Sequence, residues 1–259
     1  MRHLGGRYCL MSLNVPGTFP RPVPGQFAMV RTAGRYPLLG RPISIHDFRK
    51  QGRSAEIDFL FQEAGEGTAL LASMKKGDNV IFWGPEGNGF ELIPGGPQVL
   101  VAGGRGIAPI WFLARRMVEN GCGADHPMEL FYGAASAGEM HYIEEFRDLG
   151  FNVHVATMDG SKGRKGFITD SIMISIRKKS GAISGRPAFY ACGPTGMLEK
   201  THQISRAAGG VCQVSMESRM ACGTGVCLGC AHFTSSGSLI HVCKEGPVMY
   251  SDKVFGGAA

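Results

Sequence analysis

Four of the eight cysteines lie close together near the C-terminal end of the chain, where they could act jointly as metal ligands. They are separated by four, two and twelve residues: Cys222, Cys227, Cys230 and Cys243. Four thiolates are the ligand set of a [2Fe–2S] cluster, and three of them within one short loop is a spacing typical of such clusters. Small residues between the ligands would let the loop wrap closely and turn N–H groups toward the sulfurs: Gly223, Gly225 and Gly229. The segment is therefore predicted to bind a [2Fe–2S] cluster.

Zinc is the main competing metal, because it also binds four cysteines. Structural zinc sites usually arrange these ligands as two separated pairs. Here three cysteines share one loop, and Cys243 stands alone at the end of the later segment LIHVC. This arrangement favours iron–sulfur, while a zinc-stabilised binding module without redox activity and a set of unliganded core cysteines stay open as alternatives.

A glycine-rich turn joins an apolar run to a helical pattern in the middle of the chain. In VLVAGGRGIAPIWFLA, Gly103, Gly104 and Gly106 separate a predicted buried strand from a predicted helix. Backbone N–H groups at such a helix N-terminus point toward bound anions, and glycines let a pyrophosphate come close. The motif is not a full G-x-G-x-x-G, because Pro109 takes the place of the third glycine. It indicates a nucleotide site, with an ordinary strand-to-helix turn as the alternative.

A second turn of this kind occurs in YACGPTGML. It places Cys192, Gly193 and Pro194 directly after a predicted strand, at the edge where open parallel sheets bind ligands. Taken alone, a single free cysteine here is better explained as a small apolar core residue. The motif therefore gains weight only together with the others.

The N-terminal third of the chain contains two further motifs with anion-binding residue types. RPISI offers Arg41 for a phosphate and Ser44 for a hydrogen bond to a planar ring. GEGT at 65–68 begins the first predicted helix, which is another potential anion site. Each is weak alone, since structural turns commonly contain the same residues.

Three groups of predicted elements position these motifs. Residues 1–95 consist of short apolar runs bounded by Gly, Pro or Asn, with one helical stretch at 67–77, and predict a small antiparallel β-barrel. Residues 96–210 alternate strands with helices, as in a doubly wound parallel-sheet nucleotide domain. Residues 211–259 form the predicted [2Fe–2S] domain, so the expected fold class is multi-domain β and α/β. Helices of the middle region are predicted at 107–121, 139–150, 167–181 and 195–210.

The composition is that of an ordinary globular protein, with 44% hydrophobic and 19% charged residues in a chain of 259. No apolar run reaches the roughly 18–20 residues of a membrane span. The N-terminus lacks the apolar core of a secretory signal, so we expect a cytoplasmic protein without a membrane span. The net charge is +6, but the basic residues are scattered and not interleaved with aromatics. We therefore expect no nucleic-acid partner.

Taken together and in this order, RPIS, GEGT, GPEGNGF, the glycine turn before IAP, and CGPTGM resemble the ferredoxin–NADP reductase superfamily. Members of this superfamily join a flavin-binding barrel to a nicotinamide-binding domain. The C-terminal sequence SMESRMACGTGVCLGC…HVCKEGPVM is similar to that of the electron transfer subunits of dihydroorotate dehydrogenase B (NAD+). The resemblance covers nearly the whole chain, and the C-terminal motif is its most specific part.

The resemblance implies FAD, NAD and a [2Fe–2S] cluster as cofactors, and no catalytic residue of its own. The FAD ring and phosphates would be held by the first strand motif: Arg41, Pro42, Ile43 and Ser44. Backbone contacts to FAD would come from Leu60, Phe61 and Gln62, and contacts to its pyrophosphate from Gly67 and Thr68. NAD would be received by Gly103, Gly104 and Gly106, with its nicotinamide near Cys192, Gly193 and Pro194.

In the family, this subunit joins a catalytic subunit that carries FMN and oxidises dihydroorotate in pyrimidine (UMP) biosynthesis. Electrons run from FMN through the cluster to FAD and on to NAD⁺, in a heterotetramer of two copies of each subunit. Closely similar subunits serve NAD(P)H–ferredoxin and sulfide-linked oxidoreductases, which is the alternative within the same class. Two departures are expected: the strand before RYCLMSL is short or missing, and Arg105 replaces a small or aliphatic residue.

Overall fold

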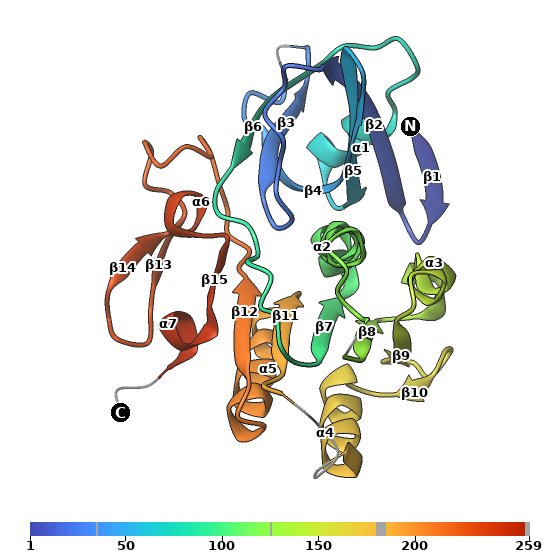
Figure 1. The fold of residues 1–259 in the computed structure, drawn as a ribbon. Helices are drawn as coiled ribbons and strands as arrows, with labels where there is room; N and C mark the ends of the chain where they lie inside the picture. Colours follow the sequence, from blue (N-terminus) through green and yellow to red (C-terminus); the bar gives the residue numbers. More distant parts are fainter. Residues whose placement is uncertain (35, 125, 180–184, 257–259) are drawn as a thin grey trace.

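The computed structural model describes residues 1–34, 36–124, 126–179 and 185–256, which form two sheets and a small appendage (Figure 1). The first sheet is antiparallel and curls around an apolar core, which confirms the predicted barrel. Its six strands follow the order β1-β2-β5-β4-β3-β6. The elements are β1 (Arg2–Gly5), β2 (Tyr8–Pro16), β3 (Phe27–Thr32), β4 (Arg41–Gln51), β5 (Ser54–Gln62), α1 (Glu66–Ala72) and β6 (Val80–Glu86). The expected short strand before Tyr8 is the four-residue β1.

Strand β4 carries a β-bulge in the middle of its pairing with β5. Ile45 pairs with Phe59 and Asp47 with Asp58, so His46 is an extra residue that faces no partner. Bulges bend a strand and re-aim its side chains. As a result four consecutive residues of β4, from Ile45 to Phe48, are buried instead of every second one.

The second sheet has seven strands in the order β10-β9-β8-β7-β11-β12-β15, and all neighbours are parallel except the last pair. Its strands are β7 (Gln98–Gly103), β8 (Met128–Ala134), β9 (Asn152–Thr157), β10 (Arg164–Lys165), β11 (Ala188–Cys192), β12 (Val211–Ser215) and β15 (Val248–Tyr250). The helices are α2 (Ile107–Glu119), α3 (Ile143–Asp148), α4 (Ile168–Lys179) and α5 (Thr195–Ala207). This is the predicted doubly wound arrangement, in which the chain order of the strands reverses beside β7.

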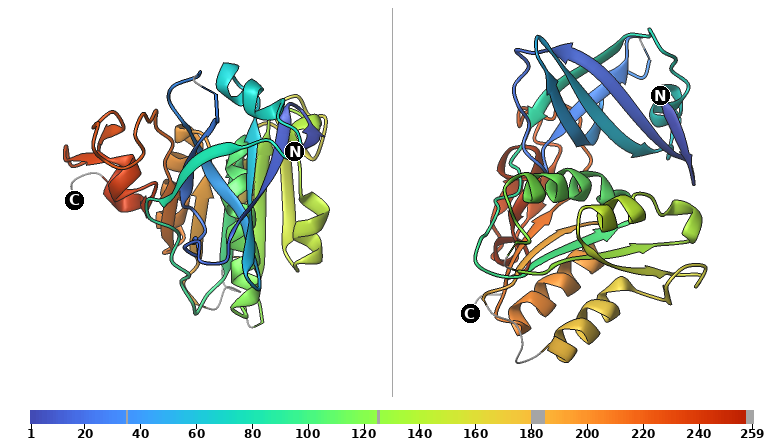
Figure 2. Two further views of the ribbon diagram at one scale, coloured as in Figure 1. Left: turned by 90° about the horizontal axis from the view of Figure 1, so that it is seen from above. Right: turned by 45° about the vertical axis from the view of Figure 1, so that its right-hand side comes forward.

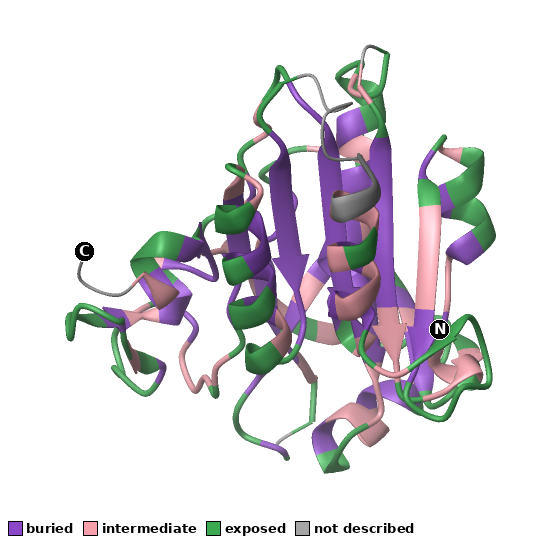
Figure 3. Cartoon of the chain, turned by 90° about the horizontal axis from the view of Figure 1, so that it is seen from below, coloured by how far each residue is buried: buried purple, intermediate pink, exposed green. Residues whose placement is uncertain are grey.

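Alternating residues of the central strands pack into two separate cores. On β7, Leu100 and Ala102 join the core that includes α2 and α3, whereas Val99 and Val101 join the core that includes α4 and α5. The central strands are buried on both faces, as parallel sheets require, and the helices expose their outer sides (Figure 3).

Two of the predicted helices end or begin elsewhere, each for a local reason. The first ends at Ala72 instead of residue 77, because Asp78 Oδ2 accepts the Lys75 N–H at 2.7 Å in a turn. The one predicted from 139 begins only at Ile143, because Tyr142 has a left-handed φ of 67°. The predicted end of the helix at 180–181 lies outside the described residues.

The cysteine-rich segment is an appendage on the edge of the second sheet (Figure 2). It contains β13 (Ala231–Phe233), β14 (Leu239–His241), α6 (Val242–Glu245) and α7 (Ser251–Phe255). Strand β12 begins at residue 211, where the sequence places the start of a separate domain, yet it pairs with β11. Strand β15 returns from the cysteine-rich segment and pairs antiparallel with β12. The second sheet therefore continues across the predicted boundary.

Helix α2 packs against both sheets. Its Phe112 is buried in the apolar core of the barrel, while Tyr8 and Leu60 of the barrel belong to the core around α2. The two folded units thus share apolar side-chain contacts. Within the described part of the chain, no helix is long and apolar enough to cross a membrane.

Candidate cofactor sites

A cavity of about 280 Å³ lies where the barrel, the parallel sheet and the cysteine-rich segment meet. It gathers nine of the predicted cofactor residues from distant parts of the chain: Arg41, Pro42, Ile43, Ser44, Leu60, Phe61, Gln62, Thr68 and Cys192. The first seven come from β4 and β5, which are neighbours in the barrel. The remaining predicted residues do not line the cavity itself: Gly67, Gly103, Gly104, Gly106, Gly193 and Pro194.

The start of α1 is held beside β4 by Arg41. A Cβ atom on Gly67 would lie 2.1 Å from Arg41 Nε, so the guanidinium passes directly over this glycine. Thr68 Oγ1 accepts the N–H groups of Ala64 and Gly65 at 2.9 and 3.1 Å and donates to Gly65 O. The motif GEGT therefore brings a fixed positive charge and a capped turn together at the end of the cavity.

The two predicted nucleotide turns pack against each other. A Cβ on Gly106 would lie 1.9 Å from Cys192 O, and one on Gly103 would lie 2.7 Å from Pro194 Cδ. These two glycines are therefore needed for close packing of the loops. Gly104 differs, because it has a φ of 51° and a Cβ there would meet only Tyr8 Oη, at 3.7 Å. Of the three, Gly104 is the one whose surroundings leave space for a ligand.

Cys192 occupies the meeting point of these loops and the cavity. Its side chain is buried, and burial together with the negative charge of Glu217 raises the pKa of its thiol to about 12. The thiol therefore stays protonated at neutral pH. Cys192 is thus a buried core cysteine that also lines the cavity.

The segment after β12 also lines the cavity, and its residues were missed in the sequence analysis: Ser215, Met216, Glu217, Ser218 and Met220. It approaches Arg105 of the first nucleotide turn, whose Nη2 lies 3.4 Å from Glu217 Oε2. The available signal was the motif SMESRMACG, which joins this segment directly to the first cluster cysteine.

The four cysteines predicted to bind the cluster occupy two environments. Cys230 and Cys243 are buried, with their Sγ atoms 3.1 Å apart, whereas Cys222 is half-buried and Cys227 is exposed. No three His, Cys, Asp or Glu side chains converge as ligands of one ion among the described residues. A [2Fe–2S] cluster takes two thiolates at each iron, so paired thiols such as Cys230 and Cys243 suit it.

Backbone N–H groups turn toward the cluster sulfurs. Cys222 Sγ accepts from Cys227 and Thr224 at 3.4 Å, and these two bonds lower the pKa of its thiol to about 6. Gly229 N–H donates to Cys227 Sγ at 3.5 Å, as its position in the loop predicts. Such N–H···S bonds stabilise thiolates and tune the potential of a bound cluster. The loop is thus shaped to hold negatively charged sulfur.

The cluster loop lies against the barrel. Trp83 Nε1 donates to Cys222 O at 2.8 Å, and a Cβ on Gly223 would lie 2.4 Å from Met29 Cγ. Phe27 lines the cavity and lies 3.6 Å from the same hypothetical Cβ. Strand β3 therefore separates the cluster loop from the cavity by little more than one side chain.

Two family models match separate parts of the chain. Residues 100–203 match the model of an oxidoreductase NAD-binding domain, and residues 217–255 match the iron–sulfur cluster binding domain of dihydroorotate dehydrogenase B. A chain in the structure of NADH-dependent reduced ferredoxin-NADP oxidoreductase superposes with a TM-score of 0.80. It is 26% identical, with 97% of this chain and 86% of that chain covered. A ferredoxin NADP+ reductase from Neisseria gonorrhoeae, 18% identical, has the same fold with a TM-score of 0.64, over 80% of this chain and 88% of that one.

Fold and site define a ferredoxin-reductase-like oxidoreductase with an added iron–sulfur segment. The "dihydroorotate dehydrogenase B (NAD(+)), electron transfer subunit" of Caldanaerobacter subterraneus subsp. tengcongensis is 38% identical over 90% of this chain and 87% of its own length. That of Bacillus velezensis is 37% identical over 89% and 86%. The chain therefore belongs to the family of dihydroorotate dehydrogenase B electron transfer subunits.

Proposed function

We propose that this chain is the electron-transfer subunit of an NAD-dependent dihydroorotate dehydrogenase. It would pass electrons from an FMN-containing catalytic subunit, through [2Fe–2S] and FAD, to NAD⁺ in pyrimidine biosynthesis. The observation that carries the proposal is the cavity at which flavin-binding motifs, a nucleotide turn and the segment leading to the cluster cysteines meet. A flavin exchanges hydride with nicotinamide and single electrons with an iron–sulfur cluster, so it belongs between the two.

Each part of the cavity suits one portion of FAD. Ser44 and the strand Leu60–Gln62 would face the ring, and Arg41 with the start of α1 would hold the pyrophosphate. The nicotinamide would approach from the side of Cys192 and Gly104. The buried, protonated thiol of Cys192 supplies a small neutral surface there, beside the charged side chains of Arg105 and Glu217, which line the same cavity.

A catalytic partner is supported by the curated relatives, which are named as electron transfer subunits of dihydroorotate dehydrogenase B. We propose that the partner carries FMN and that two copies of each subunit assemble in the cytoplasm. Copurification of the expressed pair, followed by flavin analysis and mass measurement of the complex, tests this assembly. One FMN and one FAD per pair are expected, and a complex with no FMN would contradict the proposal.

Arg41→Gln is expected to weaken FAD binding about tenfold, because one charge-assisted bond to a phosphate is worth on the order of 1.4 kcal/mol. FAD titration of the flavin-depleted protein measures the effect. Arg31→Gln is the matched control, since Arg31 lies on the neighbouring strand β3, donates to Thr32 O and Gly34 O, and does not line the cavity. Equal FAD affinity in both variants would show that Arg41 does not contribute to FAD binding.

NADH is expected to bleach the flavin of the isolated chain under anaerobic conditions, without any partner. Arg105 and Cys192 of the two nucleotide turns line one cavity with the strands proposed to bind flavin, so hydride transfer needs no residue from another subunit. The measurement is the absorbance of the FAD-loaded protein after NADH addition, with NADPH as the comparison. A flavin that stays oxidised would contradict the nicotinamide assignment.

A second candidate is a subunit of an NAD(P)H–ferredoxin oxidoreductase. It is favoured by the superposition on the NADH-dependent reduced ferredoxin-NADP oxidoreductase over nearly all of this chain. The partner distinguishes the two. A dihydroorotate-oxidising partner supports the first function, and a large partner with several iron–sulfur clusters supports the second.

A further inference from the structure

A polar network crosses the interface between the barrel and the nucleotide domain and touches the cavity described above only at Ala108. Its central residues are consecutive on β4, at the bulge: His46 and Asp47. Both are almost fully buried, with 1% and 3% of their surface exposed. Buried polar side chains are costly unless they are paired, so their partners identify what the network does.

His46 reaches the first turn of α2. Its Nδ1 lies 3.0 Å from the backbone oxygen of Ala108, which can only accept, so Nδ1 carries the proton. Burial lowers the pKa of the imidazole to about 4, so the ring is neutral near pH 7. The ring also packs against Trp111 of α2 and Tyr142, with centroids 6.2 and 4.7 Å away. The side chain therefore fixes the beginning of α2 on the barrel.

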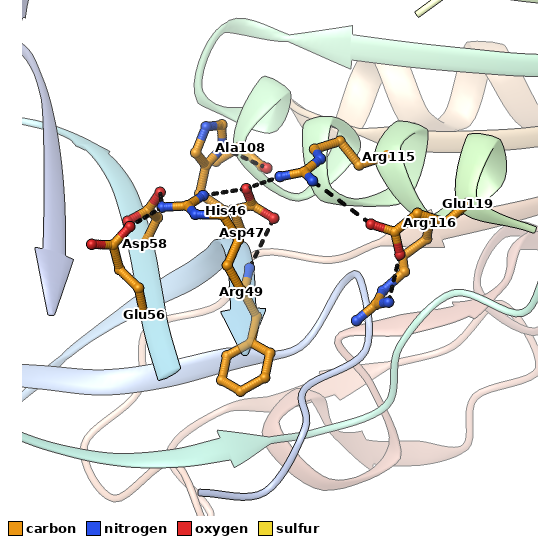
Figure 4. Close-up of polar contacts among 10 residues, drawn as sticks. His46, Asp47, Arg49, Glu56, Asp58, Ala108, Arg115, Arg116 and Glu119 are labelled. Carbon is orange, nitrogen blue, oxygen red and sulfur yellow. Dashed lines mark hydrogen bonds and ion pairs between the residues drawn. The ribbon is translucent and has the colours of Figure 1, made fainter. Parts of the chain in front are cut away.

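Asp47 makes a second connection to α2, at Arg115, which lies about two helical turns after Ala108. Its carboxylate accepts from Arg49 of its own strand and from Arg115 of α2 (Figure 4). Its other oxygen accepts the Phe48 N–H at 2.8 Å, so the carboxylate cannot rotate freely. Arg49 in turn is held by Glu56 and by Asp58, the latter at 2.7 Å. The carboxylate that receives Arg115 is thus anchored in the barrel through the Phe48 N–H and Arg49.

Both connections lie close in the chain to residues that line the cavity. His46 follows Ser44 by two residues, and Ala108 follows Gly106 by two; Ser44 and Ala108 both line the cavity. The two units also share apolar contacts here, through Phe112 in the barrel core and through Tyr8 and Leu60 in the core around α2, and apolar packing has no directional preference. Hydrogen bonds and ion pairs add the orientation that apolar packing lacks.

We propose that His46 and Asp47 are positioning residues, which clamp α2 to β4 and thereby set the alignment of nicotinamide with flavin for hydride transfer. The inference rests on the proposed function for its reaction, but the clamp itself is defined by four residues: His46, Asp47, Ala108 and Arg115. Hydride transfer depends steeply on alignment, and a displacement of about 1 Å can slow an enzyme about 100-fold. Neither His46 nor Asp47 lines the cavity proposed to hold the cofactors, so both act through β4 and α2.

The test uses the full chain loaded with FAD and cluster. His46→Leu and Arg115→Gln are expected to lower the rate of flavin reduction at saturating NADH about tenfold or more, with unchanged FAD content. The long-wavelength absorbance produced when nicotinamide stacks on flavin should weaken in the same variants. Two controls should behave as the unsubstituted protein. His46→Asn keeps a donor for Ala108 O, and Arg147→Gln breaks the ion pair with Glu144 inside α3.

Hydrogen exchange separates failure of the clamp from failure of the proposed function. Amides of the first turns of α2 should exchange faster in Arg115→Gln than in Arg147→Gln, with those of α5 unaffected. This readout needs no NADH, and it covers the case in which His46→Leu does not fold. Unchanged exchange, or unchanged reduction rate and stacking absorbance in folded variants, would overturn the clamp. A wild-type flavin that NADH does not reduce would overturn the proposed function alone, and exchange would still decide the clamp.

Discussion

Cys227→Ser is expected to remove the iron–sulfur cluster completely while leaving FAD in place. Cys227 is the exposed member of the four predicted ligands, and its loss leaves one iron with an incomplete ligand set. The flavin-binding residues lie on β4, β5 and α1, outside the cysteine-rich segment. NADH should therefore still reduce the flavin, whereas electron exchange with a partner subunit should be abolished. Iron, acid-labile sulfide and FAD content, measured on the same anaerobic preparation, check the result.

Cys122→Ser is the matched control for this experiment, because Cys122 is a partly buried free cysteine in the turn after α2. It should keep iron, sulfide and FAD. Loss of FAD together with the cluster in Cys227→Ser would show that the two sites are not independent. Zinc in place of iron and sulfide in the unsubstituted protein would support the non-redox alternative and end the electron-transfer proposal.

Gly106→Ala is expected to abolish most NADH-dependent flavin reduction, by a factor on the order of 100. Gly106 has an ordinary helical φ of −58°, so alanine suits the backbone itself. The new Cβ would instead lie 1.9 Å from Cys192 O and push the two nucleotide turns apart. Such overpacking should also lower the free energy of unfolding by roughly 1 to 3 kcal/mol. FAD content should persist, because the barrel is untouched.

Gly196→Ala provides the comparison, since Gly196 lies in α5 just after the second turn and a Cβ there would meet nothing within 4 Å. This substitution should preserve activity and raise stability slightly, as alanine favours a helix over glycine. Stopped-flow reduction by NADH and thermal unfolding of both variants supply the measurements. Similar activity in Gly106→Ala and Gly196→Ala would mean that NADH-dependent flavin reduction does not need the close contact between the two nucleotide turns.

The proposed cluster ligands and the strands that line the cavity could be selected from the sequence because their signals are local. Spacing alone selected Cys222, Cys227, Cys230 and Cys243, and short motifs selected the residues of β4 and β5 that line the cavity. The alternation of strands and helices likewise predicted the doubly wound sheet. In each case neighbours in the chain are also neighbours in the site.

The features that could not be predicted from the sequence depend on contacts between distant segments. The packing role of Gly106 requires Cys192, and these residues meet only once β7 and β11 pair. The clamp was missed for a different reason. ISIHDF has an alternating pattern that would expose His46, but the bulge inserts this residue and buries it beside Asp47. No residue type in this stretch predicts a bulge.

Strands β12 and β15 give the cysteine-rich segment an unusual attachment. Ser215 and Val248 are paired across these strands, so residues 216–247 leave the sheet and return to it at the same place. In effect the electron carrier is an insertion between the two arms of a hairpin. Because its ends are already joined, exchange for another insertion of different length costs little loop-closure entropy. The pairing of β12 with β15 therefore defines an insertion site. A flavoprotein of this type can acquire or replace a one-electron carrier there without disturbing its nucleotide sheet.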